Sequence, residues 1–178
     1  MTCASRLSQV TEGSVDQNLE CRNPHFRAHL PRRQQESTQL IDSLNKYQPQ
    51  ALAVLRIVTA LCFMAHGTQK LFGFPASEMG QPELLSLMGI AGILEVFGGL
   101  AILIGLFTRP VAFILAGQMA YAYWFLHVPM MGQGNIIPVA NGGDGAVLFC
   151  FVFLYLVFAG PGAWSADEML KSRRLATA

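Results

Sequence analysis

Long apolar runs separated by short polar turns make up the middle of the chain. Four such runs occur, at about residues 51–72, 84–107, 110–128 and 143–160. A helix needs roughly 20 apolar residues to span the hydrocarbon core of a bilayer, with about 17 to 25 tolerated. The first two runs meet this length, and the last two lie near its lower limit. The pattern predicts an all-α fold, a four-helix transmembrane bundle.

The residues between the runs are of the kinds that end and begin helices. Such sequences stand at Gly73-Phe74-Pro75, Gln81-Pro82-Glu83, Thr108-Arg109-Pro110, Asn141-Gly142-Gly143-Asp144 and Gly160-Pro161-Gly162. Glycine ends helices, proline suits the first turn of the next helix, and asparagine or aspartate can cap it. The turns therefore predict four separate helices.

Charged residues are nearly excluded from this region. The chain of 178 residues has 12 Lys and Arg, 11 Asp and Glu, and a formal net charge of +1. Only seven of these lie between residues 51 and 164, namely Arg56, Lys70, Glu78, Glu83, Glu95, Arg109 and Asp144. A soluble helical domain spreads charge along each helix to make a hydrated face. The expected partner of this region is the lipid bilayer, and the near-neutral charge gives no indication of nucleic acid.

The distribution of Lys and Arg predicts the orientation, because these residues favour the cytoplasmic side. Six lie in residues 1–50, Arg109 lies between the second and third apolar runs, and Lys171, Arg173 and Arg174 follow the last apolar run. On the other side there is only Lys70. Both termini are therefore predicted to be cytoplasmic.

Three parts follow from this pattern. Residues 51–164 form the membrane domain, and residues 165–178 are a cytoplasmic C-terminal tail. Residues 1–50 are rich in Gln, Ser, Asn, Arg and Pro, a composition that predicts a polar, mostly disordered tail. An alternative interpretation is that the natural start lies further along and part of this tail is upstream sequence.

Four polar side chains of the apolar runs are the main candidates for an intramembrane site, namely Arg56, His66, Glu95 and Gln118, and His127 is a further candidate. A charged side chain at the bilayer centre costs at least roughly 2.5 to 3.5 kcal/mol, so such residues usually face the bundle interior and have a partner. The polar residues of the first run share one helical face about 80° wide, together with apolar neighbours; this face comprises Leu52, Arg56, Thr59, Phe63, His66 and Lys70. That face is expected to point into the bundle.

On the second helix, Gly92, Glu95 and Gly99 fall within about 60° of one another. Small residues allow a neighbouring helix to approach closely. Glu95 therefore lies on the face that is expected to meet another helix.

The depths of these residues suggest a network. At about 1.5 Å per residue, Arg56 lies roughly 8 Å, Glu95 about 18 Å and His66 about 22 Å from the cytoplasmic side. These depths predict an intramembrane network of Arg56, His66 and Glu95, with Gln118 or Tyr155 nearby. Two interpretations stay open: the network orients the helices, or it forms a site for a proton, a quinone head group or another small ligand.

A second set of polar residues is predicted at the outer face: Lys70, His127, Asn141 and Asp144. The two histidines of the apolar runs, His66 and His127, are not a close pair, and the four cysteines form no C-x-x-C pair, so no metal site is predicted in this region. Cys62 and Cys150 lie within apolar runs, where a thiol behaves as a small hydrophobic side chain. No catalytic residue can be assigned from the sequence.

Several segments together resemble the DoxX family of membrane proteins over about residues 51–170. They are Leu55-Arg56-Ile57, Ala65-His66-Gly67, Gln69-Lys70-Leu71-Phe72-Gly73, Gly92-Ile93-Leu94-Glu95-Val96-Phe97-Gly98-Gly99, Gly105-Leu106-Phe107-Thr108-Arg109, Asn141-Gly142-Gly143-Asp144 and Gly160-Pro161-Gly162-Ala163-Trp164-Ser165. The long N-terminal tail departs from the family's compact form. The resemblance implies a four-helix bundle in a bacterial inner (plasma) membrane.

The resemblance also implies a link to redox chemistry, because relatives are associated with thiosulfate:quinone oxidoreductase and with membrane complexes of redox stress. The chain shows no haem-ligand pattern and no flavin motif, so catalysis by this chain alone is not expected and a quinone is the only cofactor suggested. The first hypothesis is a subunit of a redox or quinone-linked membrane complex. The alternatives are a non-enzymatic structural or partner-binding membrane protein and a small transporter that acts as a homo-oligomer.

Overall fold

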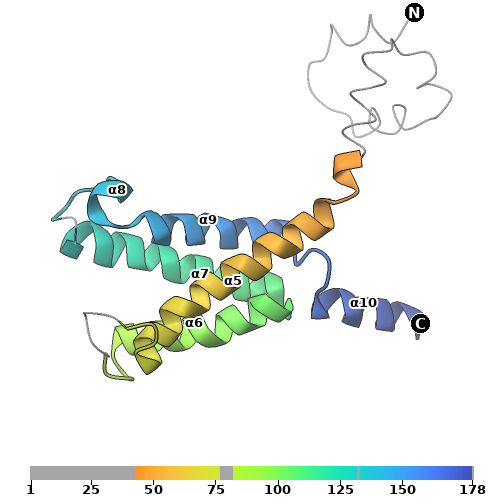
Figure 1. Ribbon diagram of the computed structural model, residues 1–178, viewed down its shortest axis with the longest axis horizontal. Helices are drawn as coiled ribbons and strands as arrows, with labels where there is room; N and C mark the ends of the chain where they lie inside the picture. Colours follow the sequence, from red (N-terminus) through yellow and green to blue (C-terminus); the bar gives the residue numbers. More distant parts are fainter. Residues whose placement is uncertain (1–42, 77–81, 132, 178) are drawn as a thin grey trace, which may run out of the picture. The chain divides into compact units, whose positions relative to one another are not determined.

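The computed structural model describes residues 43–76, 82–131 and 133–177. Residues 1–42 of the predicted polar tail lie outside the described residues, and the helices described below belong to the unit Tyr47–Ala178. Every regular element of this unit is helical over its described part. In order these are α5 (Gln48–Phe72), α6 (Leu87–Ile104), α7 (Thr108–Ala122), the π-helix η2 (Tyr123–Met131), α8 (Pro138–Asn141), α9 (Asp144–Ala159) and α10 (Ala166–Ala176) (Figure 1).

Three of the four predicted spans are long and apolar enough to cross a membrane. These are α5 with 25 residues, α6 with 18, and a span of 22 residues, Thr108–Pro129, that runs from α7 into η2. The fourth, α9, is apolar but has only 16 residues. At 1.5 Å per residue α9 is about 24 Å long, against a hydrocarbon core of about 30 Å. The all-α prediction is confirmed. Helix α9 is the shortest of the four predicted spans when α7 and η2 are counted as one.

The helix ends differ from the predicted ones by a few residues for local reasons. Helix α6 begins at Leu87 because the hydroxyl of Ser86 caps it, accepting a hydrogen bond from the Gly89 amide at 3.1 Å. It ends at Ile104, before the predicted end, because Gly105 takes the left-handed conformation with φ of 70°. This conformation is the usual helix terminator and strongly favours glycine.

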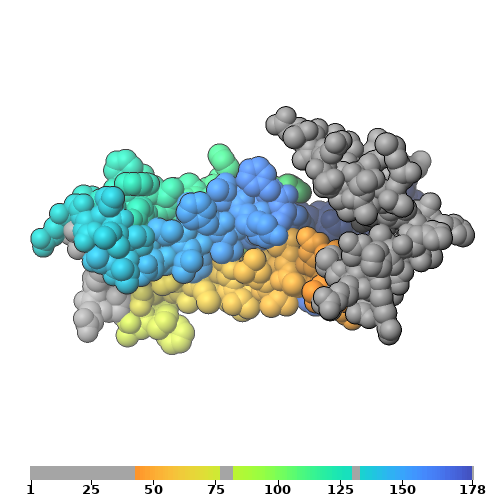
Figure 2. All heavy atoms as spheres, turned by 90° about the horizontal axis from the view of Figure 1, so that it is seen from above, coloured from red at the N-terminus to blue at the C-terminus, as the bar shows by residue number. Residues whose placement is uncertain are grey.

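The apolar helices pack mainly as two pairs, α5 with α6 and α7 with α9, and α6 also contacts α7. Figure 1 shows the two pairs crossing, and Figure 2 shows α9 lying beside α5 along one face. Aromatic rings join these two helices: the Phe63 ring on α5 lies 5.2 Å from that of Phe149 and 4.8 Å from that of Phe153, between centroids. Edge-to-face contacts of this kind are favoured by the ring quadrupole.

The outer surfaces of the helices are covered by large apolar side chains. Val58, Phe97, Phe113 and Phe151, one from each apolar helix, are all more than half exposed. A soluble monomer rarely exposes so continuous an apolar surface. These faces therefore suit contact with lipid tails.

The predicted C-terminal tail contains a helix that the sequence analysis did not anticipate. Ser165 caps α10, and the Asp167 carboxylate accepts hydrogen bonds from the amides of Phe107 and Thr108 at 2.8 and 2.9 Å. Those amides start α7, where a negative charge is favoured by the helix dipole. The Ala163 amide also donates to the Pro49 carbonyl at 2.9 Å. The segment after α9 is therefore hydrogen-bonded to the N-terminal ends of α5 and α7.

Candidate functional site

Glu95 lies where α5 and α6 approach each other closely. A Cβ placed on Gly67 of α5 would lie 2.8 Å from the Glu95 Cβ and 2.9 Å from the Val96 backbone nitrogen. Only a residue without a side chain fits between the two backbones there. Gly92, Glu95 and Gly99 are all buried on α6, as the stripe of small residues predicted.

The Glu95 carboxylate joins three helices. Its Oε1 accepts hydrogen bonds from the Lys70 Nζ of α5 at 2.5 Å and from the Gln118 Nε2 of α7 at 3.1 Å. Gln118 Nε2 also lies 3.3 Å from the Ala91 carbonyl oxygen. The side chain of Glu95 is 2 % exposed and that of Lys70 is 22 % exposed. The pair is thus an ion pair with one buried partner and one partner that reaches toward the helix end.

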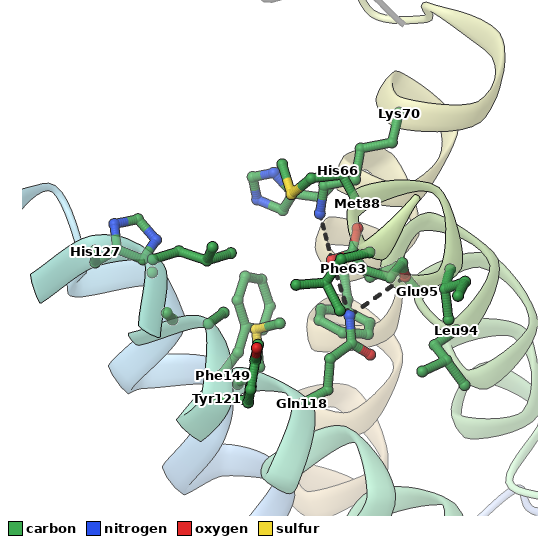
Figure 3. A pocket seen from close by; sticks show the side chains of 18 of the residues that line it. Phe63, His66, Lys70, Met88, Leu94, Glu95, Gln118, Tyr121, His127 and Phe149 are labelled. Carbon is green, nitrogen blue, oxygen red and sulfur yellow. Dashed lines mark hydrogen bonds and ion pairs between the residues drawn. The ribbon is translucent and has the colours of Figure 1, made fainter. Parts of the chain in front are cut away.

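These side chains line a cavity of about 510 Å³ between α5, α6, α7, η2 and the start of α9. In Figure 3, Lys70, Glu95 and Gln118 point toward one another at this cavity. The other walls are largely apolar; they include Phe63, Met88, Leu94, Ile114, Met119 and Phe149. Small-molecule sites in proteins are typically cavities of about 300 to 1,000 Å³ with apolar walls and a few convergent polar groups. The cavity has both properties.

Both predicted histidines border the same cavity. His66 is exposed on α5, and its ring lies 5.8 Å from that of Phe149 in an edge-to-face arrangement. His127 is carried by η2, and its Nδ1 lies 3.3 Å from the Asn141 carbonyl oxygen. A π-helix is wider than an α-helix and often marks a functional site.

Arg56 lies elsewhere, so the prediction that it belongs to one network with Glu95 is wrong. Its guanidinium donates to the carbonyls of Ile102 and Leu103, both at 2.7 Å, at the C-terminal end of α6. It also donates to the backbone carbonyl of Trp164 at 3.0 Å and lies 3.4 Å from the backbone carbonyl oxygen of Ala163. Glu95 lies about 10 Å before Ile102 along the axis of α6, so Arg56 donates to backbone carbonyls at the end of α6 instead.

The predicted outer polar residues separate into different roles. Lys70 pairs with Glu95 and belongs to the cavity. Asn141 is buried and structural: its Nδ2 donates to the Asn135 carbonyl and its Oδ1 accepts from the Gly143 amide, both at 2.8 Å. Asp144 is exposed in the first turn of α9. Tyr155, named as an alternative neighbour of Glu95, is 51 % exposed and is not part of the cavity wall.

Metal ligation finds no support in the part of the chain that the structure describes. Over residues 43–76, 82–131 and 133–177, no three His, Cys, Asp or Glu side chains gather as a metal site requires. Cys62 and Cys150 are free thiols. The absence of a metal from the whole chain stays a prediction.

The sequence analysis missed two features of the site. Gly67 received no role, although a glycine on the polar stripe of the first helix was a signal of close helix approach. The π-helical turn that carries His127 was also missed, and Pro129, directly after the predicted third helix, was the signal for irregular backbone there.

Comparison with known proteins gives several relatives. The model of the DoxX family matches residues 51–128. A Haemophilus influenzae protein named only as uncharacterized is 48 % identical over 135 residues, which cover 72 % of this chain and 96 % of the relative. The inner membrane protein YqjF of Escherichia coli is 28 % identical over 142 residues, which cover 73 % of this chain and 99 % of the relative. The inner membrane protein YphA of the same organism is 29 % identical over 132 residues, which cover 68 % of this chain and 91 % of the relative.

No solved structure gives a significant match. The family match, the extent of the identity and the apolar helices agree with one another. The chain therefore belongs to the DoxX family, and it is a multi-pass protein of the inner membrane.

Proposed function

We propose that this chain is a small subunit of a quinone-linked redox system of the inner membrane, and that it holds the head group of a lipophilic ligand in the cavity beside Glu95. The observation that carries this proposal is a cavity of about 510 Å³ at which a buried ion pair meets largely apolar walls. An intramembrane ionisable group is by default a candidate for function.

The composition of the cavity fits an amphipathic ligand. Lys70, Glu95 and Gln118 supply hydrogen-bonding groups at one place, and His66 and His127 lie at its border. The remaining lining is dominated by Leu, Ile, Met, Ala and Phe side chains. A ring with polar substituents would meet the first group, and its hydrocarbon tail would meet the second.

The distribution of Lys and Arg supports a specific orientation of this cavity. With both termini in the cytoplasm, Lys70 near the end of α5 lies in the outer half of the membrane. The cavity would then receive its ligand from the outer half of the bilayer. Arg56 and Arg109 would both lie near the cytoplasmic surface, where basic residues are enriched.

Replacement of Ala91 by phenylalanine is expected to prevent ligand binding, because the new ring would fill the cavity next to Gln118. The purified protein in detergent micelles should gain thermal stability from a short-chain quinone such as decylubiquinone or its reduced form. At a concentration of 100 times the dissociation constant, the stabilisation should be about 2.7 kcal/mol. Ala91→Phe should lose most of this gain.

Ala65→Phe is the matched control, since Ala65 is exposed on α5 and does not line the cavity. It should retain the ligand-dependent rise in melting temperature. The proposal fails if neither redox form stabilises the unaltered protein, or if both variants respond to the ligand as the unaltered protein does.

A second candidate function is purely structural, and one observation favours it: Glu95 connects α5, α6 and α7 through Lys70 and Gln118. In that case the unaltered protein should show no ligand binding, and Glu95→Gln should only lower the melting temperature. Under the proposed function, Glu95→Gln should weaken ligand binding by roughly tenfold, about 1.4 kcal/mol, in the fraction that remains folded. Isothermal titration of the folded protein, with melting measured alongside, separates the two.

A further inference from the structure

Tyr155 carries a hydroxyl group on the lipid-facing side of α9, a helix that lies at the surface of the bundle (Figure 2). Its side chain is 51 % exposed, and no group in residues 43–76, 82–131 and 133–177 forms a hydrogen bond with it. A tyrosine hydroxyl is both a donor and an acceptor. Lipid tails are neither, so this hydroxyl stays unpaired in the hydrocarbon core unless another protein surface meets it.

The position of Tyr155 along α9 keeps its hydroxyl away from both membrane surfaces. Helix α9 runs over Asp144–Ala159, and at 1.5 Å per residue Tyr155 lies about 5 Å past the midpoint. Helical side chains lean toward the N-terminus of their helix, so the phenol ring of Tyr155 extends back toward the midpoint. The hydroxyl therefore lies roughly 10 Å from either end of α9, where water at the surfaces does not reach it.

The neighbours of Tyr155 form a continuous apolar surface, the α9 outer face, which comprises Leu148, Phe151, Tyr155 and Phe158. All four side chains are more than half exposed. Their spacing of three, four and three residues places them within about 80° of one another around the helix. This is the spacing with which two helices pack along a common seam.

We infer that a second copy of this chain packs on the α9 outer face, with the two α9 helices parallel. In a dimer with two-fold symmetry, a residue near the axis meets the same residue of the other copy. Tyr155 then lies opposite its counterpart, and one hydroxyl donates a hydrogen bond to the other. A hydroxyl is suited to this self-pairing because it both donates and accepts, whereas two equal charges would repel each other.

The length of α9 favours the same arrangement. With 16 residues it is about 24 Å long, against a hydrocarbon core of about 30 Å. A helix shorter than the core thins the bilayer around it or associates with other helices. Two short helices that lie side by side share one thinned region, so fewer lipids are distorted than around two separate copies. The inference uses neither the cavity nor its ligand and stands apart from the proposed function.

Cysteine cross-linking in native membranes tests which face is shared. The four native cysteines of the full chain are replaced by alanine, and Phe151→Cys is introduced on α9. Phe113→Cys on α7 is the matched control, because Phe151 and Phe113 are 65 % and 66 % exposed. Oxidation with copper phenanthroline should join the Phe151→Cys chains into dimers and leave the Phe113→Cys chains monomeric. Equal or greater cross-linking of Phe113→Cys, or no cross-linking of either variant, would overturn the inference.

Tyr155→Phe tests the hydroxyl itself, because it removes one oxygen and keeps the ring. Fluorescence energy transfer between labelled full chains in phosphatidylcholine vesicles, measured over a range of protein-to-lipid ratios, gives the dissociation constant of the dimer. Tyr155→Phe should raise this constant about threefold to tenfold, the effect of one hydrogen bond between membrane helices. Tyr121→Phe on α7, where Tyr121 is also exposed, should leave it unchanged. An unchanged constant in Tyr155→Phe, or an equal rise in both variants, would contradict the pairing of the two hydroxyls.

Discussion

Replacing Arg56 by leucine is expected to lower the free energy of unfolding by about 3 kcal/mol, since a hydrogen bond from a charged donor contributes about 1.5 to 3 kcal/mol. The Arg56 side chain is completely buried and donates to carbonyls at the end of α6 and in the segment after α9. Leucine can donate to none of them. The Ile102 carbonyl would keep only its hydrogen bond from the Gly105 amide, and the Leu103 carbonyl would lose its charged donor.

Unfolding by added SDS, followed by circular dichroism in mixed micelles, measures this loss. Arg109→Leu is the matched control, because Arg109 is exposed and donates to the carbonyls of Val157 and Phe158 at 2.6 and 2.9 Å. Water can replace those bonds, so the control should lose about 1 kcal/mol or less. Equal losses in the two variants would show that burial of Arg56 does not govern its contribution.

Gly67→Ala is expected to cost about 3 kcal/mol, the upper end of the range for overpacking, and to abolish ligand binding. The new Cβ would lie 2.8 Å from the Glu95 Cβ and 2.9 Å from the backbone nitrogen of Val96. A backbone atom cannot rotate away as a side chain can, so α5 and α6 must separate. Lys70 and Glu95 would separate with them.

Gly117→Ala on α7 is the control for this substitution, because a Cβ there would meet no atom within 4 Å. In a helix, replacement of glycine by alanine should then stabilise by roughly 0.5 to 1 kcal/mol. Both variants are compared by SDS unfolding and by quinol titration. A Gly67→Ala protein that binds ligand normally would mean that close contact of α5 and α6 is not needed to form the site.

Part of the candidate site could be predicted from helical periodicity alone. On the predicted face of the first helix Arg56, Thr59 and Phe63 are buried, whereas His66 is exposed. Glu95 is buried on the predicted face of the second helix. Gln118 was also expected near Glu95 and hydrogen-bonds to it. These results follow from the high cost of exposing polar groups to lipid, which any arrangement of the helices must avoid.

The partner of Glu95 could not be predicted in this way. Arg56 and Lys70 lie on the same face of the first helix, and Glu95 is between them in estimated depth, so periodicity permits either pairing. The choice depends on where α6 ends. Its terminal carbonyls lie level with Arg56 and take its donors, which leaves Lys70 to neutralise Glu95.

The sequence by itself determined the apolar helices, their approximate ends and the faces turned away from lipid, because hydrophobic length, helical period and turn residues are local properties. The pairing of Lys70 with Glu95, the cavity around it and the cap that Asp167 places on α7 were decided only by the tertiary structure. Each depends on atoms that lie far apart in the chain and come together only when the helices cross. The physical reason is that a hydrogen bond requires positions accurate to a fraction of an ångström, whereas periodicity gives only a face and an approximate depth.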